Sequence, residues 1–138
     1  MTAPILLDTC TAMWIMNNGA MKRSAEEAID AASDRGQRIF ISPITGWEVG
    51  MLASKGRFRS AYTPQKWLER LLSLPHIALA SMPPELLMGS SFLPGKPPKD
   101  PWDRVIIATA REYGYVLVTR DQETLEYAKH GHLSVLEC

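Results

Sequence analysis

Four acidic residues of this sequence are suited to act together in chemistry although they lie far apart along the chain: Asp8, Glu48, Asp103 and Asp121. Carboxylates that are packed together repel one another unless a cation lies among them. Oxygen donors without cysteine or histidine favour hard cations, so the expected ion is Mg²⁺ or Mn²⁺. Such an ion polarises a phosphoryl oxygen and activates a water for in-line attack. The pattern does not decide between one ion and two.

The positions of these acids relative to the predicted strands suggest that they meet. Asp8 ends the apolar run ILLD, and Asp121 follows the strand-like run YVLVT by two residues. Glu48 lies in the second turn of the helix that follows the run RIFIS. Because residues beyond the carboxyl ends of parallel strands gather at one edge of a sheet, we expect these three to converge. Asp103, in the first turn of its own helix, joins them if that helix begins at the same edge.

Short apolar runs alternate with helical segments along the chain, which predicts an α/β fold: a three-layer α/β/α domain around a mostly parallel sheet. Ser24 and Glu27 are expected to form a capping box at the start of the second helix. The predicted strands are 5–8, 38–42, 77–80, 115–119 and 133–137, and the predicted helices are 9–16, 24–36, 43–56, 64–74, 83–93, 101–114 and 122–129.

Each acid also has a simpler, structural interpretation as a helix cap. Asp8 can cap the turn after the first strand, and Asp121 can cap the helix that follows it. Asp100 precedes a proline, which is a favoured start of a helix, and Asp103 in the first turn suits the helix dipole. Glu48 has the weakest structural explanation, since it lies on a mostly apolar helix. The joint placement favours a metal site, with Asp100 kept as a cap.

Composition limits the classes of protein to which this chain can belong. Its 138 residues, 46% hydrophobic and 22% charged, are typical of one globular domain. The start of the chain lacks the features of a signal peptide, and no apolar run approaches a membrane span, so we expect a cytoplasmic protein with no membrane contact. Cys10 and Cys138 lie at opposite ends, which indicates neither a zinc site nor a disulfide framework. Cys10 has no histidine near it in sequence and is expected to be a small buried packing residue.

The charges balance at 15 basic and 15 acidic residues, so any binding of nucleic acid must come from a local patch. Lys55, Arg57 and Arg59 form the one locally basic stretch, which suits RNA phosphates, an acidic partner or plain solvent. Lys99 and Arg104 flank the proposed metal edge and are the better candidates for positioning a substrate phosphate.

Four ordered motifs carry a resemblance that covers essentially the whole chain: LLDTC, SPITGWEVGMLASKGR, KDPWDRVIIATA and LVTRD. In this order they resemble the PIN-domain family, and most closely its VapC-type toxins of bacterial toxin–antitoxin modules. The resemblance implies a metal-dependent endoribonuclease with a compact α/β fold, usually dimeric, that a cognate VapB-type antitoxin holds inactive.

The resemblance also carries residue roles to this sequence. The acidic residues of the family fall on the four acids named above, and Thr119 matches a hydroxyl commonly found near that site. Asp100 matches the first acid of the family's DPxDR segment. Relatives often have His-Arg before that segment, whereas this chain has Pro98 and Lys99, so a role for the family's histidine is not transferred.

The function expected from residues and resemblance together is that of a toxin that cleaves structured RNA, such as tRNA or rRNA, at a Mg²⁺ or Mn²⁺ site. The preference for RNA over DNA comes from the resemblance alone. The alternative is a PIN-like module that binds RNA or protein without cutting; loss of one acid would favour it, and all four are present. The expected partners are an RNA substrate, the antitoxin and a second copy of the chain in a homodimer.

Overall fold

The computed structural model describes residues 3–138, and its centre is a five-stranded sheet in the order β3-β2-β1-β4-β5. All four strand pairs are parallel, with Leu6 opposite Phe40 on one side and Leu117 on the other. The prediction of a mostly parallel sheet is confirmed. The strands are β1 (Ile5–Leu7), β2 (Ile39–Ile41), β3 (Ile77–Leu79), β4 (Val116–Thr119) and β5 (Val135–Glu137).

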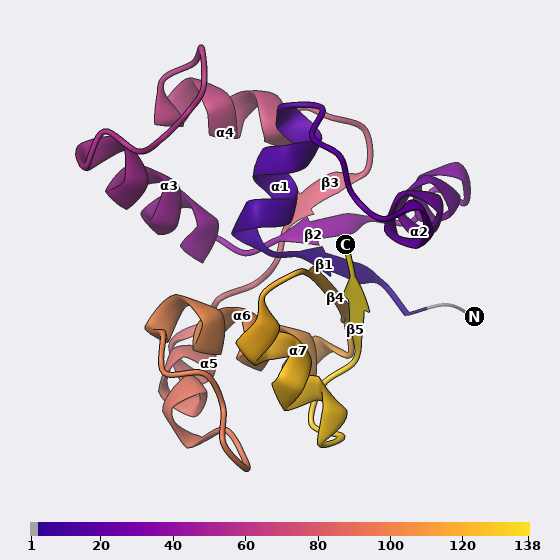
Figure 1. Cartoon of the computed structure of the whole chain (residues 1–138), viewed down its shortest axis with the longest axis vertical. Helices are drawn as coiled ribbons and strands as arrows, with labels where there is room; N and C mark the ends of the chain where they lie inside the picture. The colour runs from indigo at the N-terminus through magenta and orange to yellow at the C-terminus, as the bar shows by residue number, and fades with distance from the viewer. Residues whose placement is uncertain (1–2) are drawn as a thin grey trace.

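Helices cover both faces of this sheet, so the three-layer prediction is confirmed. Figure 1 shows the strands crossing the middle of the molecule, with α1 to α4 on one side and α5 to α7 on the other. The helices are α1 (Thr9–Met16), α2 (Arg23–Asp34), α3 (Ile44–Ser54), α4 (Pro64–Leu72), α5 (Pro84–Gly89), the 3₁₀ turn η1 (Ser90–Phe92), α6 (Pro101–Tyr113) and α7 (Gln122–Lys129).

Alternate residues of the strands supply two separate cores. Leu7 and Val118 belong to one core, into which α4 inserts the fully buried Trp67. Leu6 and Leu117 belong to the other, together with Ile107 of α6. A parallel sheet covered on both faces needs apolar residues at successive positions, which explains why runs such as ILL and VLV lack polar alternation.

Most helix boundaries agree with the sequence signals, and one does not. Asp100 caps α6, and Gly114 ends that helix with a φ of +69°, a conformation that glycine adopts without strain. The predicted capping box at α2 is wrong. That helix begins at Arg23, one residue earlier, and has no side-chain cap, because Glu27 pairs with Arg23 at 3.1 Å instead of reaching back to Ser24.

None of the helices within residues 3–138 combines the length and apolar character of a membrane span.

Candidate active site

The beginnings of α1, α3, α6 and α7 bring the four predicted acids into one electrostatic neighbourhood. Asp8 and Asp121 are the N-caps of α1 and α7. Asp103 lies in the first turn of α6, and Glu48 lies one turn into α3. The charges of the other three acids, together with that of Asp100, add to the rise in the pKa of Asp103. Asp8, Glu48 and Asp121 follow β1, β2 and β4, which are parallel neighbours, so the fold agrees with the expected gathering at the carboxyl edge of the sheet.

Asp8 is held in one orientation by two hydrogen bonds. Its Oδ1 accepts the backbone N–H of Thr11 at 2.8 Å, and its Oδ2 accepts the hydroxyl of Thr119. The same hydroxyl oxygen of Thr119 accepts the backbone N–H of Asp121 at 3.0 Å. Thr119, buried at the end of β4, therefore joins the two acids that end neighbouring strands.

Asp121 both caps α7 and belongs to the acidic group. Its Oδ2 accepts the backbone N–H of Thr124 at 2.9 Å and the hydroxyl of the same residue at 2.7 Å. The capping interpretation of Asp8 and Asp121 is thus confirmed. It does not compete with a role in chemistry, because each carboxylate keeps unused lone pairs while the cap fixes its direction.

Glu48 is positioned by two threonines that sequence reasoning did not single out. Its Oε1 accepts the hydroxyl of Thr9 at 2.7 Å, and Thr9 lies 3.0 Å from the hydroxyl of Thr45. Burial raises the pKa of Glu48, the Thr9 hydrogen bond opposes this shift, and the charges of Asp100 and Asp8 add to it. In the sequence, the only indication of this role for Thr9 is its position directly after Asp8.

Asp103 has no such support. Within residues 3–138 no hydrogen bond reaches its carboxyl group, whereas Asp100 accepts the N–H of Trp102 at 2.8 Å as a helix cap should. Burial raises the pKa of Asp103 to about 7, and the charges of Asp100, Asp121, Glu48 and Asp8 contribute in that order. The two aspartates at the start of α6 therefore differ in kind: Asp100 caps the helix, and Asp103 is a part-buried acid with a raised pKa.

The donor set fits a hard divalent cation. None of the four acids takes part in an ion pair in the described chain, so their charges are not neutralised by the protein. As the side chains stand, no three His, Cys, Asp or Glu residues among 3–138 close around an ion. The assignment of the four acids as metal ligands stays a prediction.

Of the two cations expected to bind phosphate, only Lys99 is freely exposed. The Nε of Arg104 donates to the backbone carbonyl of Pro98 at 2.6 Å, which ties α6 to the loop before it. Arg104 therefore has a structural contact that sequence reasoning did not foresee, and its phosphate role stays a prediction, as does that of Lys99.

Cys10 is exposed, so the expectation of a buried packing residue is wrong. It follows Asp8 by two residues, on the side of α1 that faces the acids rather than the core. Partial removal of the thiol from water raises its pKa to about 11, and the charges of the four acids all add to the shift. A thiol whose pKa is raised in this way favours its protonated form at neutral pH, which argues against a nucleophilic role.

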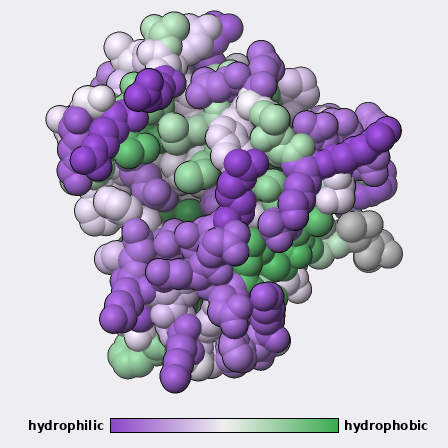
Figure 2. Space-filling model, in the orientation of Figure 1, coloured by the Kyte–Doolittle hydropathy of each residue, from purple (hydrophilic) through white to green (hydrophobic). Residues whose placement is uncertain are grey.

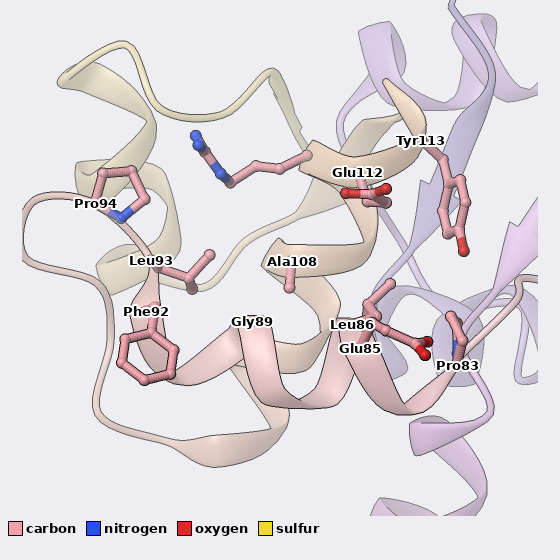
Figure 3. Close-up of a pocket in the computed structure, with 11 residues that line it drawn as sticks. Pro83, Glu85, Leu86, Gly89, Phe92, Leu93, Pro94, Ala108, Glu112 and Tyr113 are labelled. Atoms are coloured by element: carbon pink, nitrogen blue, oxygen red, sulfur yellow. The ribbon is translucent and has the colours of Figure 1, made fainter.

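The four acids are half-buried at the surface. Figure 2 shows that hydrophilic side chains cover most of the lower part of this face, where Figure 1 places α6 and α7. A hollow of about 430 Å³ lies elsewhere, between α5, η1 and α6 (Figure 3). Phe92 and Leu93 line it on one side and Ala108 and Glu112 on the other, and none of the four acids is among its lining residues.

Comparison with known proteins decides the family. The model of the PIN domain matches residues 5–130. This chain belongs to the PIN-domain family. It is similar to Ribonuclease VapC22 of Mycobacterium tuberculosis, with 31% identity over 119 residues that cover 86% of this chain and 87% of the relative.

Solved structures share the fold of this PIN domain. VapBC2 from Rickettsia felis bound to a DNA fragment from its promoter matches with a TM-score of 0.67 and 18% identity, over 96% of this chain and 98% of that one. DNA-bound VapBC from Salmonella typhimurium gives 0.66 and 18%, over 99% and 98%. FitAB bound to an IR36 DNA fragment gives 0.55 and 17%, over 96% and 94%.

Proposed function

We propose that this PIN domain is a Mg²⁺- or Mn²⁺-dependent endoribonuclease that cleaves structured RNA, with tRNA or rRNA as the expected class. The observation that carries the proposal is that Asp8, Glu48, Asp103 and Asp121 lie at the beginnings of helices along one edge of the sheet and form no ion pair within residues 3–138. A relative that is 31% identical is named a ribonuclease, which supports RNA as the substrate.

The four carboxylates would hold the metal, which supplies polarisation of the phosphoryl oxygen and activation of a water. The protein's own contribution is orientation. Thr119 and the N–H of Thr11 hold the Asp8 carboxylate in one orientation, and Thr9 does the same for Glu48. Lys99, exposed beside the start of α6, is placed to attract a substrate phosphate.

We further propose that this chain is the toxin of a toxin–antitoxin pair, with a VapB-type antitoxin as partner and a homodimer as its own assembly. Two of the structures that share its fold are named as VapBC, and its ribonuclease relative is named VapC22. An unopposed nuclease damages the cell that makes it, which is a physical reason for a partner that masks the acidic edge.

The test is cleavage by the purified chain. We expect it to cut structured RNA in Mg²⁺ or Mn²⁺, to stop in EDTA, and to lose activity in Asp8→Asn. Cleavage that continues unchanged in chelator, in a preparation whose Asp8→Asn counterpart is inactive, would contradict the metal site. RNA that binds without being cut in either ion would instead support the non-cleaving module.

A further inference from the structure

An exposed aromatic side chain lies directly beside the acidic edge. Trp47 precedes Glu48 on α3, and its side chain is 58% exposed. Single exposed apolar residues are ordinary on protein surfaces. Trp47 differs from such residues in two respects. It is followed by Glu48, one of the four acids, and its ring contacts a second tryptophan.

The ring of Trp47 is held by a second tryptophan from the other side of the site. Trp102 precedes Asp103 on α6, and the two indoles meet edge to face, with centroids 5.5 Å apart and an interplanar angle of 86°. Trp102 is half-buried and packs against the core beneath α6. Its Nε1 is buried with no hydrogen-bond partner in the described chain, so apolar packing alone holds this indole. The half-buried ring of Trp102 thus positions the exposed ring of Trp47, and each tryptophan precedes one of the four acids in the chain.

Electrostatics around the site limit what can supply affinity for RNA there. The protein has no net charge, and the four acids repel a phosphate backbone wherever a cation does not neutralise them. A neutral contact close to the metal avoids this repulsion. Stacking of a base on an aromatic ring is such a contact, and it tolerates any base because each presents a π-face.

We infer that Trp47 is a stacking platform for one unpaired base of the RNA, adjacent to the phosphodiester that is cut. This inference rests on the proposed function and assigns to Trp47 a contact with an unpaired base of the RNA. A base that is paired within a helix cannot present its face to the indole. Trp47 and Trp102 precede Glu48 and Asp103 and contact each other across α3 and α6, so the exposed indole lies where the helices that carry two of the acids meet. A base is the favoured occupant over a protein side chain, because a base stacked there is joined to the phosphate backbone that the proposed nuclease cuts.

The test measures binding in a background that does not cut. In Glu48→Gln, with Mg²⁺ present, we compare Trp47→Ala and Trp47→Phe with the unchanged parent for affinity to a short single-stranded oligoadenylate. Loss of one stacked base is worth about 1–3 kcal/mol, so Trp47→Ala should weaken binding by about 5- to 150-fold. Trp47→Phe should retain most of the affinity. The same strand annealed to its complement should bind equally to parent and Trp47→Ala.

Two controls separate stacking from a general loss of structure or of apolar surface. Phe92→Ala removes an even more exposed ring, 84% exposed, that lies at the hollow between η1 and α6, and it should leave RNA affinity unchanged. RNA should also quench the tryptophan emission of the parent, and most of this quenching should disappear in Trp47→Phe although binding persists.

The outcomes keep the two proposals distinct. If the wild type cleaves RNA in Mg²⁺ but Trp47→Ala in the non-cutting background binds the single strand as well as its parent, the stacking inference is overturned and the nuclease proposal stands. If Trp47→Ala weakens only a complex with a protein partner, Trp47 is a protein contact and the inference is equally wrong. A wild type that neither binds nor cuts RNA overturns both.

Discussion

At the scale of single residues, two aspartates three positions apart have different environments. Asp100 accepts the N–H of Trp102 and caps α6, while the carboxyl of Asp103 has no hydrogen-bond partner within residues 3–138 and a pKa raised to about 7. An acid that served only the helix dipole would sit in solvent with an ordinary pKa. The environment of Asp103 therefore fits a carboxyl group that binds a cation.

Replacing Asp103 with asparagine tests this difference through stability. Removal of one charge from a repelling group should leave the melting temperature in EDTA unchanged or higher. The variant should also lose most of the rise in melting temperature that Mg²⁺ gives the wild type, because a damaged site binds the ion less tightly. Thermal melts in EDTA and in excess Mg²⁺ measure both effects.

Asp100→Asn is the matched control, since asparagine caps a helix about as well as aspartate and should change little. If Asp103 were only a first-turn acid and not part of a metal site, Asp103→Asn would give the reverse result. It would lose about 0.3–1 kcal/mol of folding stability in either buffer. A wild type that gains nothing from Mg²⁺ or Mn²⁺ would argue against the site as drawn.

The raised pKa of Asp103 also predicts a pH dependence of the metal-free protein. The ordinary pKa is 3.8 and the folded value about 7, so the unfolded chain releases this proton first as the pH rises. The stability associated with the protonated group is therefore fully present below about pH 4 and is lost as the pH passes through about 7. Melting temperatures in EDTA across this range should fall more steeply for the wild type than for Asp103→Asn. Equal slopes would contradict the shift.

Thr119→Val should remove the hydroxyl that connects Asp8 with the backbone of Asp121, while the shape of the side chain stays nearly the same. It removes the hydrogen bond to Asp8 and leaves the N–H of Asp121 without its acceptor, at a cost of about 1–3 kcal/mol, and the Mg²⁺-induced stabilisation should shrink. Thr109→Val is the matched control. Thr109 is equally buried, but its hydroxyl bonds only the carbonyl of Val105 in its own helix, so the response to Mg²⁺ should persist.

At the scale of secondary-structure elements, the beginnings of helices orient the acidic side chains. The cap of α7 fixes the direction of the Asp121 carboxylate through Thr124, so structural and chemical roles coincide in one side chain. Asp121→Asn keeps the cap and should leave the metal-free stability nearly unchanged. Asp121→Ala loses the cap and should cost about 0.5–2 kcal/mol by chemical denaturation. Both should lose the response to Mg²⁺; a normal response in Asp121→Asn would reduce Asp121 to a cap alone.

At the scale of the whole molecule, the proposed role as a toxin predicts a cellular effect. Induced expression of the chain alone should arrest growth, because an unmasked nuclease cuts cellular RNA. Co-expression of the neighbouring reading frame should relieve the arrest, and Asp8→Asn should be harmless from the start. Growth curves after induction give the answer. A chain that cleaves RNA in the test tube but is harmless at high level in its native host would exclude the toxin role and leave the ribonuclease proposal intact.

The sequence by itself determined the architecture and led to the expectation that the four acids gather at one edge of the sheet. Alternating apolar runs and helical segments imply a covered parallel sheet, and parallel strands oblige Asp8, Glu48 and Asp121 to emerge at one edge. Capping signals at Asp100 and Asp121 are local, since they act within a single helical turn, and both were read correctly. The capping box at Ser24 was misread because a neighbouring ion pair competed for Glu27.

Only the tertiary structure decided how these parts meet. The arrival of α6 at the acidic edge depends on how that helix packs on the sheet, and it raises the pKa of Asp103 through burial that no local pattern records. The exposure of Cys10 follows from which side of α1 the core occupies. The pairing of Trp47 with Trp102 joins residues from different helices, 55 positions apart by their numbers. Such contacts depend on the packing of whole elements, which sequence spacing along one element does not encode.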